Sequence, residues 1–146
     1  MQCAPFSFPV TPTVRIRQNV LSALLAQARR SPETEVCGLL SGRDGEVIEI
    51  FPAANASAKP ETSFEIGPRE LFQNMRTLRR AKLDLLGIYH SHPRTLNEPS
   101  PTDISLAFYP EVAYFIVSPR EDVERPVRAF IIRNGAAKEL NIEVVT

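Results

Sequence analysis

Two histidines one residue apart, at the end of an apolar segment, constrain this chain more than any other feature. His90 and His92 are the only histidines in the 146 residues, and an apolar run over residues 85–88 precedes them. The run predicts a β-strand over residues 85–90. In an extended backbone, residues i and i+2 lie on the same side. The two imidazoles are therefore expected to point to one place just where a buried strand ends.

A carboxylate follows in a segment that has the form of a helix start. Asp103 lies eleven residues beyond His92, in the run Ser100-Pro101-Thr102-Asp103. Ser100 fits the N-cap, Pro101 the first helical residue, and Asp103 the acidic position of the first turn. Two imidazoles and one carboxylate are three protein ligands for zinc, and a fourth position left to water is typical of a catalytic site. We expect one Zn²⁺ per chain, although these ligand types also permit iron(II) or manganese.

Glu35 is a charged residue at the start of an otherwise apolar segment. Residues 35–41 have the composition of a strand that is buried on both faces. Burying a carboxylate is costly unless it has a partner. A metal-bound water is such a partner, so we expect Glu35 to lie beside the metal.

The remaining pattern predicts an α+β fold, a mixed β-sheet of about seven to eight strands packed with about three helices. Helices are expected over residues 18–30 and 68–81, and a third at the Ser-Pro-Thr-Asp run. The buried stripe of the second helix is expected to contain Leu71, Phe72, Met75 and Leu78. Further strands are expected over residues 14–16, 46–51, 63–66, 112–117, 127–133 and 138–145, with hairpin turns at 42–45 and 134–135.

The N-terminal end of the chain is richer in proline than the rest. Prolines are frequent in residues 1–13, which predicts an extended proline-rich N-terminal arm. Residues 14–146 are long enough for a single domain with its own core.

Composition excludes several classes of function. The formal net charge is zero, which gives no argument for nucleic acid. No apolar run approaches the roughly 18 residues of a membrane-spanning helix. Two cysteines, Cys3 and Cys37, make no disulfide framework, and Cys37 is expected to be a small buried hydrophobe. We therefore expect a cytoplasmic protein that binds neither nucleic acid nor a membrane.

Three motifs together resemble a known family. Glu35-Val36-Cys37-Gly38, His90-Ser91-His92-Pro93 and Ser100-Pro101-Thr102-Asp103 look like the signature of the JAMM, or MPN+ (Mov34/PAD-1), zinc metallopeptidases. The resemblance runs from about residue 14 to the C-terminus and fills every motif position. It is strongest to the small prokaryotic single-domain type that acts on ubiquitin-like sulfur carriers. It implies a curved mixed sheet with layering close to that of cytidine deaminases.

The resemblance also implies roles for the matching residues. His90, His92 and Asp103 correspond to the zinc ligands, Glu35 to the catalytic glutamate, and Ser100 to the serine that helps stabilise the oxyanion. In this reading zinc-bound water attacks the carbonyl carbon, with Glu35 as general base and then general acid.

The implied substrate is a protein tail. The family cleaves a peptide or isopeptide bond after the C-terminal Gly-Gly tail of a ubiquitin-like or sulfur-carrier protein, which makes such a carrier the expected partner. The enzyme itself is expected to be a monomer or homodimer. A tail could add as a strand beside residues 52–66.

Other functions stay open. A close alternative is a deubiquitinase-like isopeptidase that removes a bacterial ubiquitin-like modifier from lysine. A non-catalytic metal-binding interaction module is another. A zinc nucleoside deaminase is disfavoured because that chemistry uses a Pro-Cys-x-x-Cys pair, and neither cysteine here is so placed.

Overall fold

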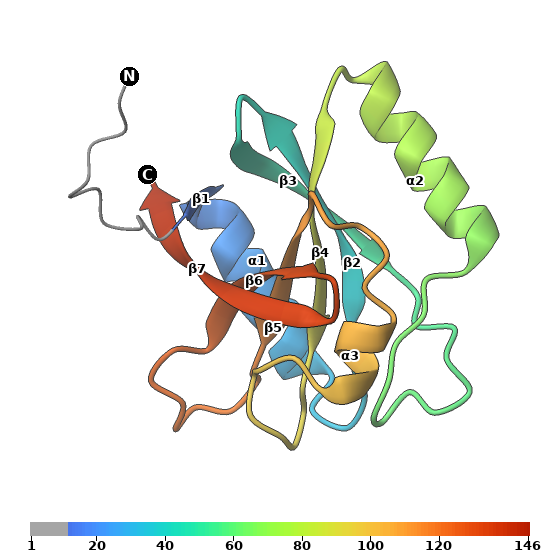
Figure 1. Ribbon diagram of the computed structural model, residues 1–146, viewed down its shortest axis with the longest axis vertical. Helices are drawn as coiled ribbons and strands as arrows, with labels where there is room; N and C mark the ends of the chain where they lie inside the picture. The colour runs from blue at the N-terminus through green and yellow to red at the C-terminus, as the bar shows by residue number, and fades with distance from the viewer. Residues whose placement is uncertain (1–11) are drawn as a thin grey trace.

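The computed structural model describes residues 12–146 and contains seven strands and three helices in those residues (Figure 1). The proline-rich arm lies almost wholly outside this range, and the division into an arm over residues 1–13 and one domain over 14–146 stays a prediction. The elements in chain order are β1 (Thr13–Arg17), α1 (Gln18–Arg30), β2 (Cys37–Arg43), β3 (Glu46–Ala53), α2 (Pro68–Arg80), β4 (Asp84–Ser91), α3 (Pro101–Ser105), β5 (Ala113–Val117), β6 (Val127–Arg133) and β7 (Ala136–Val145).

The strands form one mixed sheet that curves until its two ends meet. The order is β1-β3-β2-β4-β5-β6-β7, and β7 pairs in turn with β1. The pairs β1–β3, β1–β7 and β4–β5 are parallel, and the other four are antiparallel. The predicted α+β class, with a curved mixed sheet and three helices, is confirmed.

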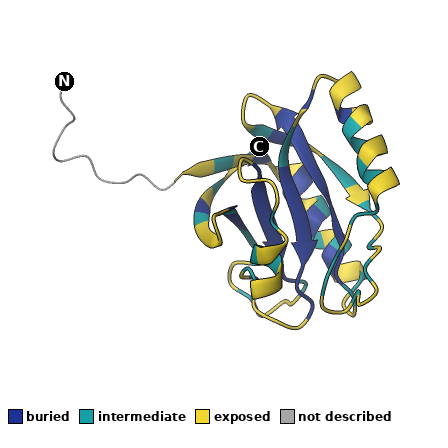
Figure 2. Ribbon diagram, turned by 45° about the vertical axis from the view of Figure 1, so that its right-hand side comes forward, coloured by how far each residue is buried: buried dark blue, intermediate teal, exposed yellow. Residues whose placement is uncertain are grey.

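Both faces of the central strands are buried, as Figure 2 shows by their dark colour. One cluster contains Val20, Leu24 and Ala28 of α1 against Leu40, Tyr89 and Phe115 of the sheet. The other contains Leu78 of α2 against Leu39, Ile88 and Ile116 of the sheet, and Ile104 of α3 packs against this cluster. Neighbouring residues along a strand thus enter opposite cores, as the period of two requires. His90 shares parity with Ile88 and so lies on the α2–α3 side.

Local sequence accounts for the turns. Asp44 and Gly45 join β2 to β3, and Asn134 and Gly135 join β6 to β7, all with positive φ. Two consecutive residues with positive φ form the type I′ turn that suits the twist of a hairpin, for which Asn-Gly and Asp-Gly are the preferred pairs. Both predicted hairpins are confirmed.

Two predicted details are wrong. Phe72 is 61% exposed on α2. Successive helical residues are about 100° apart, so Phe72 lies to one side of the buried stripe of Leu71, Met75 and Leu78. The guanidinium of Arg76 lies over the exposed Phe72 ring. Residues 63–66 form no strand. They make a single bridge, between Ile66 and Asn55, and side-chain hydrogen bonds replace the ladder.

Other boundaries differ from the predicted ones by at most two residues. The shift that matters is at β2, which begins at Cys37, so that Glu35 precedes the strand rather than opening it. Cys37 is fully buried, as expected. Among residues 12–146, every helix is too short or too polar to cross a membrane.

Candidate metal centre

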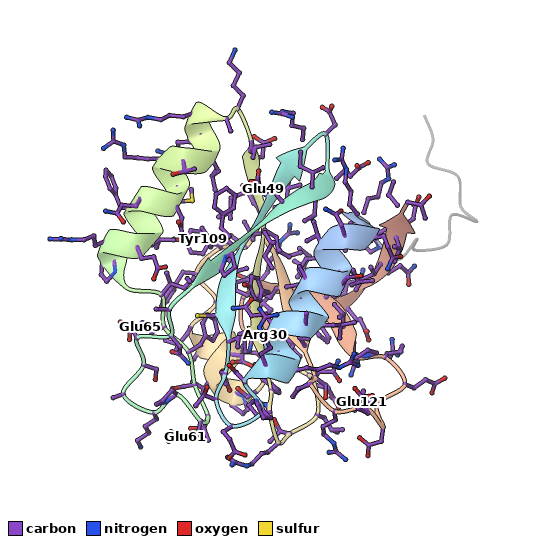
Figure 3. The ribbon with its side chains drawn as sticks, turned by 180° about the vertical axis from the view of Figure 1, so that it is seen from behind. Arg30, Glu49, Glu61, Glu65, Tyr109 and Glu121 are labelled. Atoms are coloured by element: carbon purple, nitrogen blue, oxygen red, sulfur yellow. The ribbon has the colours of Figure 1, made fainter. Side chains whose placement is uncertain are left out.

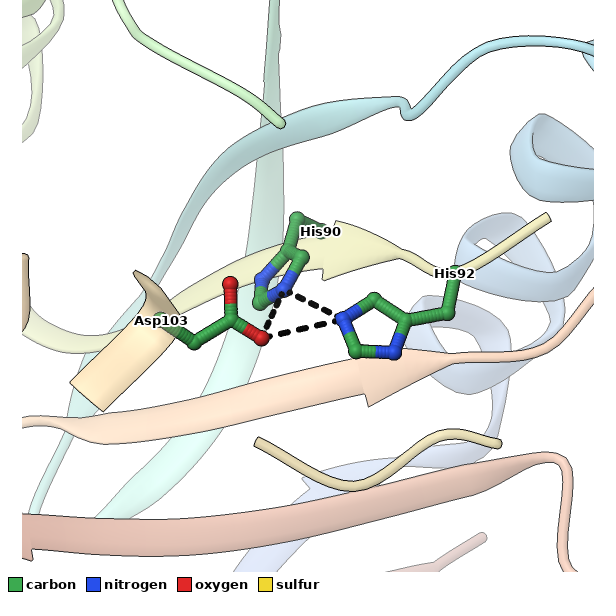
Figure 4. Close-up of side chains that lie close together, drawn as sticks. All are labelled: His90, His92 and Asp103. Carbon is green, nitrogen blue, oxygen red and sulfur yellow. Dashed lines mark hydrogen bonds and ion pairs between the residues drawn. The ribbon is translucent and has the colours of Figure 1, made fainter. Parts of the chain in front are cut away.

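His90, His92 and Asp103 bring three ligand atoms to one point (Figure 4). The two histidine Nε2 atoms are 3.1 Å apart. Asp103 Oδ2 lies 3.1 Å from Nε2 of His90 and 3.0 Å from Nε2 of His92. Both histidines are buried and the aspartate is largely so. The three possible metal-binding atoms therefore come from the end of β4 and the start of α3.

The strand β4 fixes the histidine pair through its register. His90 pairs with Cys37 on one side and with Ile116 on the other, so it lies in the middle of the sheet. Ser91 points to the opposite face, where its Oγ accepts a hydrogen bond of 2.9 Å from the N–H of Val36. The residue between the two histidines therefore ties β4 to the peptide that follows Glu35.

A capping box fixes Asp103 at the start of α3. Ser100 Oγ accepts from the Asp103 N–H at 3.0 Å, and Asp103 Oδ2 accepts from the Ser100 N–H at 3.0 Å. This reciprocal arrangement satisfies two N–H groups that the helix leaves without partners. The oxygen that faces the imidazoles is thus the same oxygen that closes the box, and the predicted cap is confirmed.

Electrostatics favour the protonation state that a metal requires at two of these three residues, His90 and Asp103. Burial lowers the pKa of His90, which keeps it neutral. Burial opposes ionisation of Asp103, but the hydrogen bonds to His90 and His92 outweigh it and hold the carboxyl pKa well below its usual range. Burial also acts to lower the pKa of His92, yet its bonds to Asp103 and to the Leu96 carbonyl raise the pKa on balance. The centre therefore combines a carboxylate with at least one neutral imidazole.

The donor set fits zinc. Three ligands of a tetrahedral zinc ion lie roughly 3.3 Å from one another, close to the separations of 3.0 and 3.1 Å here. Nδ1 of His92 lies 2.7 Å from the carbonyl oxygen of Leu96. A bond of this kind fixes the tautomer and leaves Nε2 free as the ligand.

Glu35 lies beside this group in a buried position. It is 5% exposed, and no residue in the described range donates to its Oε1. Burial raises the pKa of Glu35 to about 7, with His92 opposing the rise and Asp103 adding to it. A carboxyl group with a pKa near neutrality is suited to take up and release a proton.

Two features of the surroundings have no counterpart in the sequence motifs. The ring of Phe64 stacks on that of His90, with centroids 4.4 Å apart. A cavity of about 420 Å³ opens beside His90 and Asp103, lined mostly by apolar side chains. The loop between β3 and α2, which carries Glu61 and Glu65 in Figure 3, supplies one wall, and residues 102–109 supply another. The only sequence signal for Phe64 is an aromatic residue in a segment with strand-like alternation.

The comparisons with known proteins agree with one another. Residues 17–131 match the family described as prokaryotic homologs of the JAB domain. The chain is 34% identical over 132 residues to a protein of Mycobacterium tuberculosis named CysO-cysteine peptidase, covering 89% of this chain and 90% of the relative. It is 35% identical over 105 residues to a desampylase of Haloferax volcanii, covering 70% and 76%. It is 34% identical over 120 residues to a probable TtuB-protein conjugate cleaving protease of Thermus thermophilus, covering 82% and 76%.

Solved structures share the fold. A protein of Desulfitobacterium hafniense superposes with a TM-score of 0.81 at 32% identity, covering 90% of this chain and 92% of that one. A JAB1/MPN domain protein from Archaeoglobus fulgidus superposes with a TM-score of 0.59 at 23% identity, covering 91% and 97%. The family model, the relatives and the fold lead to one conclusion: the chain belongs to the prokaryotic JAB-domain family, and it is a small metallopeptidase of the JAMM/MPN type.

Proposed function

We propose that this enzyme hydrolyses the peptide or isopeptide bond that follows the C-terminal Gly-Gly tail of a ubiquitin-like or sulfur-carrier protein. His90, His92 and Asp103 would hold one zinc ion, and Glu35 would act as general base and general acid. The observation that carries the proposal is a buried carboxyl group, with a pKa near 7, beside three converging ligand atoms.

Zinc held by these ligands would lower the pKa of a water molecule to about 7 and polarise a carbonyl oxygen. Glu35 takes a proton from the attacking water and then delivers it to the departing amine. Ser100 Oγ already accepts from the Asp103 N–H. A hydroxyl has one hydrogen to donate besides its acceptor sites, so Ser100 can donate toward the carbonyl oxygen as negative charge develops there.

The names of the relatives support a carrier protein as substrate. One relative is named a CysO-cysteine peptidase and another a TtuB-protein conjugate cleaving protease. The cavity beside His90 and Asp103 is bounded by residues 63–66, which make one antiparallel bridge through Ile66. A glycine-rich tail offers backbone rather than side chains, and an extended segment is what such a backbone can pair with. The tail would therefore run along residues 63–66 toward the ligands.

The catalytic assignment is tested with Glu35→Gln. This variant keeps the size of the side chain but cannot take up a proton, so turnover should fall roughly 10²–10⁴-fold while zinc content stays at one per chain. Glu33→Gln is the matched control, because Glu33 is exposed and pairs only with Arg94 in the described range. Near-normal turnover by zinc-loaded Glu35→Gln would remove Glu35 from the mechanism.

The ligand assignment needs a separate measurement. His92→Ala and Asp103→Ala should each lose zinc, as measured by elemental analysis after dialysis, whereas Asp122→Ala at an exposed ion pair should not. Full zinc occupancy in either ligand variant would contradict the assignment.

Two substrates separate the alternatives. One is a ubiquitin-like carrier extended by a cysteine after Gly-Gly, and the other is the same carrier joined through Gly-Gly to a lysine side chain. Faster hydrolysis of the first favours release of an amino acid from the carrier, and faster hydrolysis of the second favours deconjugation. No hydrolysis of either by zinc-loaded enzyme would support a non-catalytic binding module. The oligomeric state, monomer or homodimer, stays a prediction.

A further inference from the structure

Glu35 is held in place by bonds that lie outside the β-sheet ladder. It precedes β2, so its position depends on other partners. Its N–H donates to the Pro60 carbonyl at 2.8 Å. Its own carbonyl accepts a hydrogen bond of 3.0 Å from Nδ2 of Asn55. Both partners belong to the loop between β3 and α2, so this loop determines where the Glu35 peptide lies.

Asn55 is the centre of that loop. Its Nδ2 also donates to the Ser63 carbonyl at 3.0 Å. Its Oδ1 accepts from the N–H of Ser57 at 3.0 Å and from the N–H of Glu65 at 3.1 Å. A side-chain amide has two hydrogens to donate and two lone pairs to accept with, and all four are used here. Aspartate lacks the hydrogens, and glutamine is longer by one methylene group.

The same amide connects Glu35 to the covering of a metal-binding histidine. Ser63 and Glu65, both bonded to Asn55, flank Phe64, whose ring stacks on His90. One side chain thus joins the peptide of Glu35 to the segment that packs on the ligand group.

We propose that Asn55 is a positioning residue for hydrolysis: it aims the Glu35 carboxyl group by fixing its peptide and holds Phe64 against His90. This inference rests on the proposed role of Glu35. If Asn55 only stabilised the loop between β3 and α2, its loss would affect the stability of that loop and the binding of substrate but not kcat.

Two substitutions at Asn55 test the role. Asn55→Ala removes all four bonds. Asn55→Asp is nearly isosteric and can keep both acceptor bonds, but it loses the donation to Glu35 and places a carboxylate against two carbonyl oxygens. Both should lower kcat on the order of 10–100-fold, the size of effect that a misplacement of about 1 Å produces, with zinc content unchanged. Ser57→Ala is the matched control, because it removes the Ser57–Ser63 side-chain bond in the same loop without touching Glu35. It should leave kcat unchanged.

A second readout does not depend on activity. Amide hydrogen exchange in the peptide containing Glu35 and Val36 should be faster in zinc-free Asn55→Ala than in zinc-free Ser57→Ala, at matched thermal stability. A change in KM alone, or equal exchange in the two variants, would overturn the positioning role. Failure of both Asn55 variants to fold would assign Asn55 to stability and overturn it as well.

Combining the variants separates this inference from the proposed function. If Asn55 acts through Glu35, Asn55→Ala should cost little further kcat in a Glu35→Gln background. If Glu35→Gln alone leaves turnover intact, the proposed role of Glu35 fails. If Glu35→Gln is impaired but the two losses multiply, the assignment of Glu35 stands and that of Asn55 fails.

Discussion

The Glu35 carboxyl group is buried where neither a positive side chain nor a hydrogen-bond donor in the described range satisfies its Oε1. Glu33, two residues earlier, is exposed and bonded to Arg94. The difference follows from the fold, because residue 35 lies just before β2, where the loop after β3 bonds to its peptide. A buried carboxyl group with no donor at Oε1 in the described range and a pKa near 7 is typical of a catalytic residue rather than a structural one.

Glu35→Gln should therefore stabilise the zinc-free protein in a pH-dependent way. Because the folded-state pKa, about 7, is above the ordinary value of 4.5, the folded protein binds the extra proton, and that stabilisation is lost as pH rises from 4.5 through 7. The gain of the variant over the native chain should be small at pH 4.5 and reach about 3 kcal/mol at pH 8, since one pKa unit corresponds to about 1.4 kcal/mol. Urea unfolding of both zinc-free proteins at the two pH values measures it. An equal difference in the free energy of unfolding at the two pH values would show that the fold does not raise the pKa of Glu35.

At the scale of elements, local patterns predicted most of what the chain forms. Asp44-Gly45 and Asn134-Gly135 sit at hairpin turns because those residues accept positive φ. The helix start at Ser100 follows from its capping residues. The errors occur where the pattern is ambiguous. An apolar residue such as Phe72 cannot be assigned to a face from helical spacing when its neighbour Leu71 competes for the same stripe. Residues 63–66 alternate like a strand, yet Asn55 takes up the N–H of Glu65 that a ladder would have used.

The face of α2 can be tested by two truncations. Leu78 is buried and Phe72 is exposed. Leu78→Ala should lower the free energy of unfolding by about 2–5 kcal/mol, because it removes buried atoms and leaves a cavity. Phe72→Ala should change it by less than about 1 kcal/mol. Chemical denaturation of the two variants gives both values, and a larger loss at Phe72 would place that ring in a contact that the structure lacks.

The cap that Ser100 supplies and the catalytic role that we propose for its hydroxyl group can be separated by substitution. Ser100→Ala removes the cap and should cost about 1 kcal/mol of stability, whereas glycine at an N-cap costs only a few tenths. Ser100→Gly should therefore keep most of the stability and the zinc content but lose turnover along with the hydroxyl group. Thermal denaturation, zinc analysis and kcat together test this. Normal turnover in Ser100→Gly would leave Ser100 with the capping role alone.

For the whole molecule, the sequence predicted the composition of the site better than its surroundings. The strand period predicts that His90 and His92 share a face, and the cap pattern predicts where Asp103 lies on its helix. Neither predicts that Phe64 stacks on His90 or that Asn55 reaches Glu35, because these contacts depend on how the loop between β3 and α2 folds back over the sheet. Long-range packing, which no local pattern encodes, determines that part.

Metal removal should leave the fold intact. Two apolar clusters fill the two faces of the sheet without the ligands, and Nε2 of His92 already lies 3.0 Å from Oδ2 of Asp103. Chelation should therefore lower Tm without unfolding the protein at 25 °C. Added zinc should raise Tm with concentration, because ligand at 100 times Kd adds about 2.7 kcal/mol to the free energy of unfolding. Circular dichroism melts with chelator and with graded zinc measure this. Loss of the folded signal on chelation would indicate a structural metal instead.

The alternation along His90-Ser91-His92 has one further consequence. The side chains of His90 and His92 lie on one face of the strand. The side chain of Ser91, between them, lies on the opposite face and accepts a hydrogen bond from the N–H of Val36. Deleting one residue upstream in β4 would slide the strand and exchange its faces. The Ser91 side chain would then take the position of an imidazole, and both imidazoles would point into the apolar cluster that contains Val20, Leu24 and Ala28 of α1. Such a register shift would abolish the proposed metal binding and disrupt tertiary packing in one step, so the part of β4 that precedes this tripeptide cannot change in length by one residue.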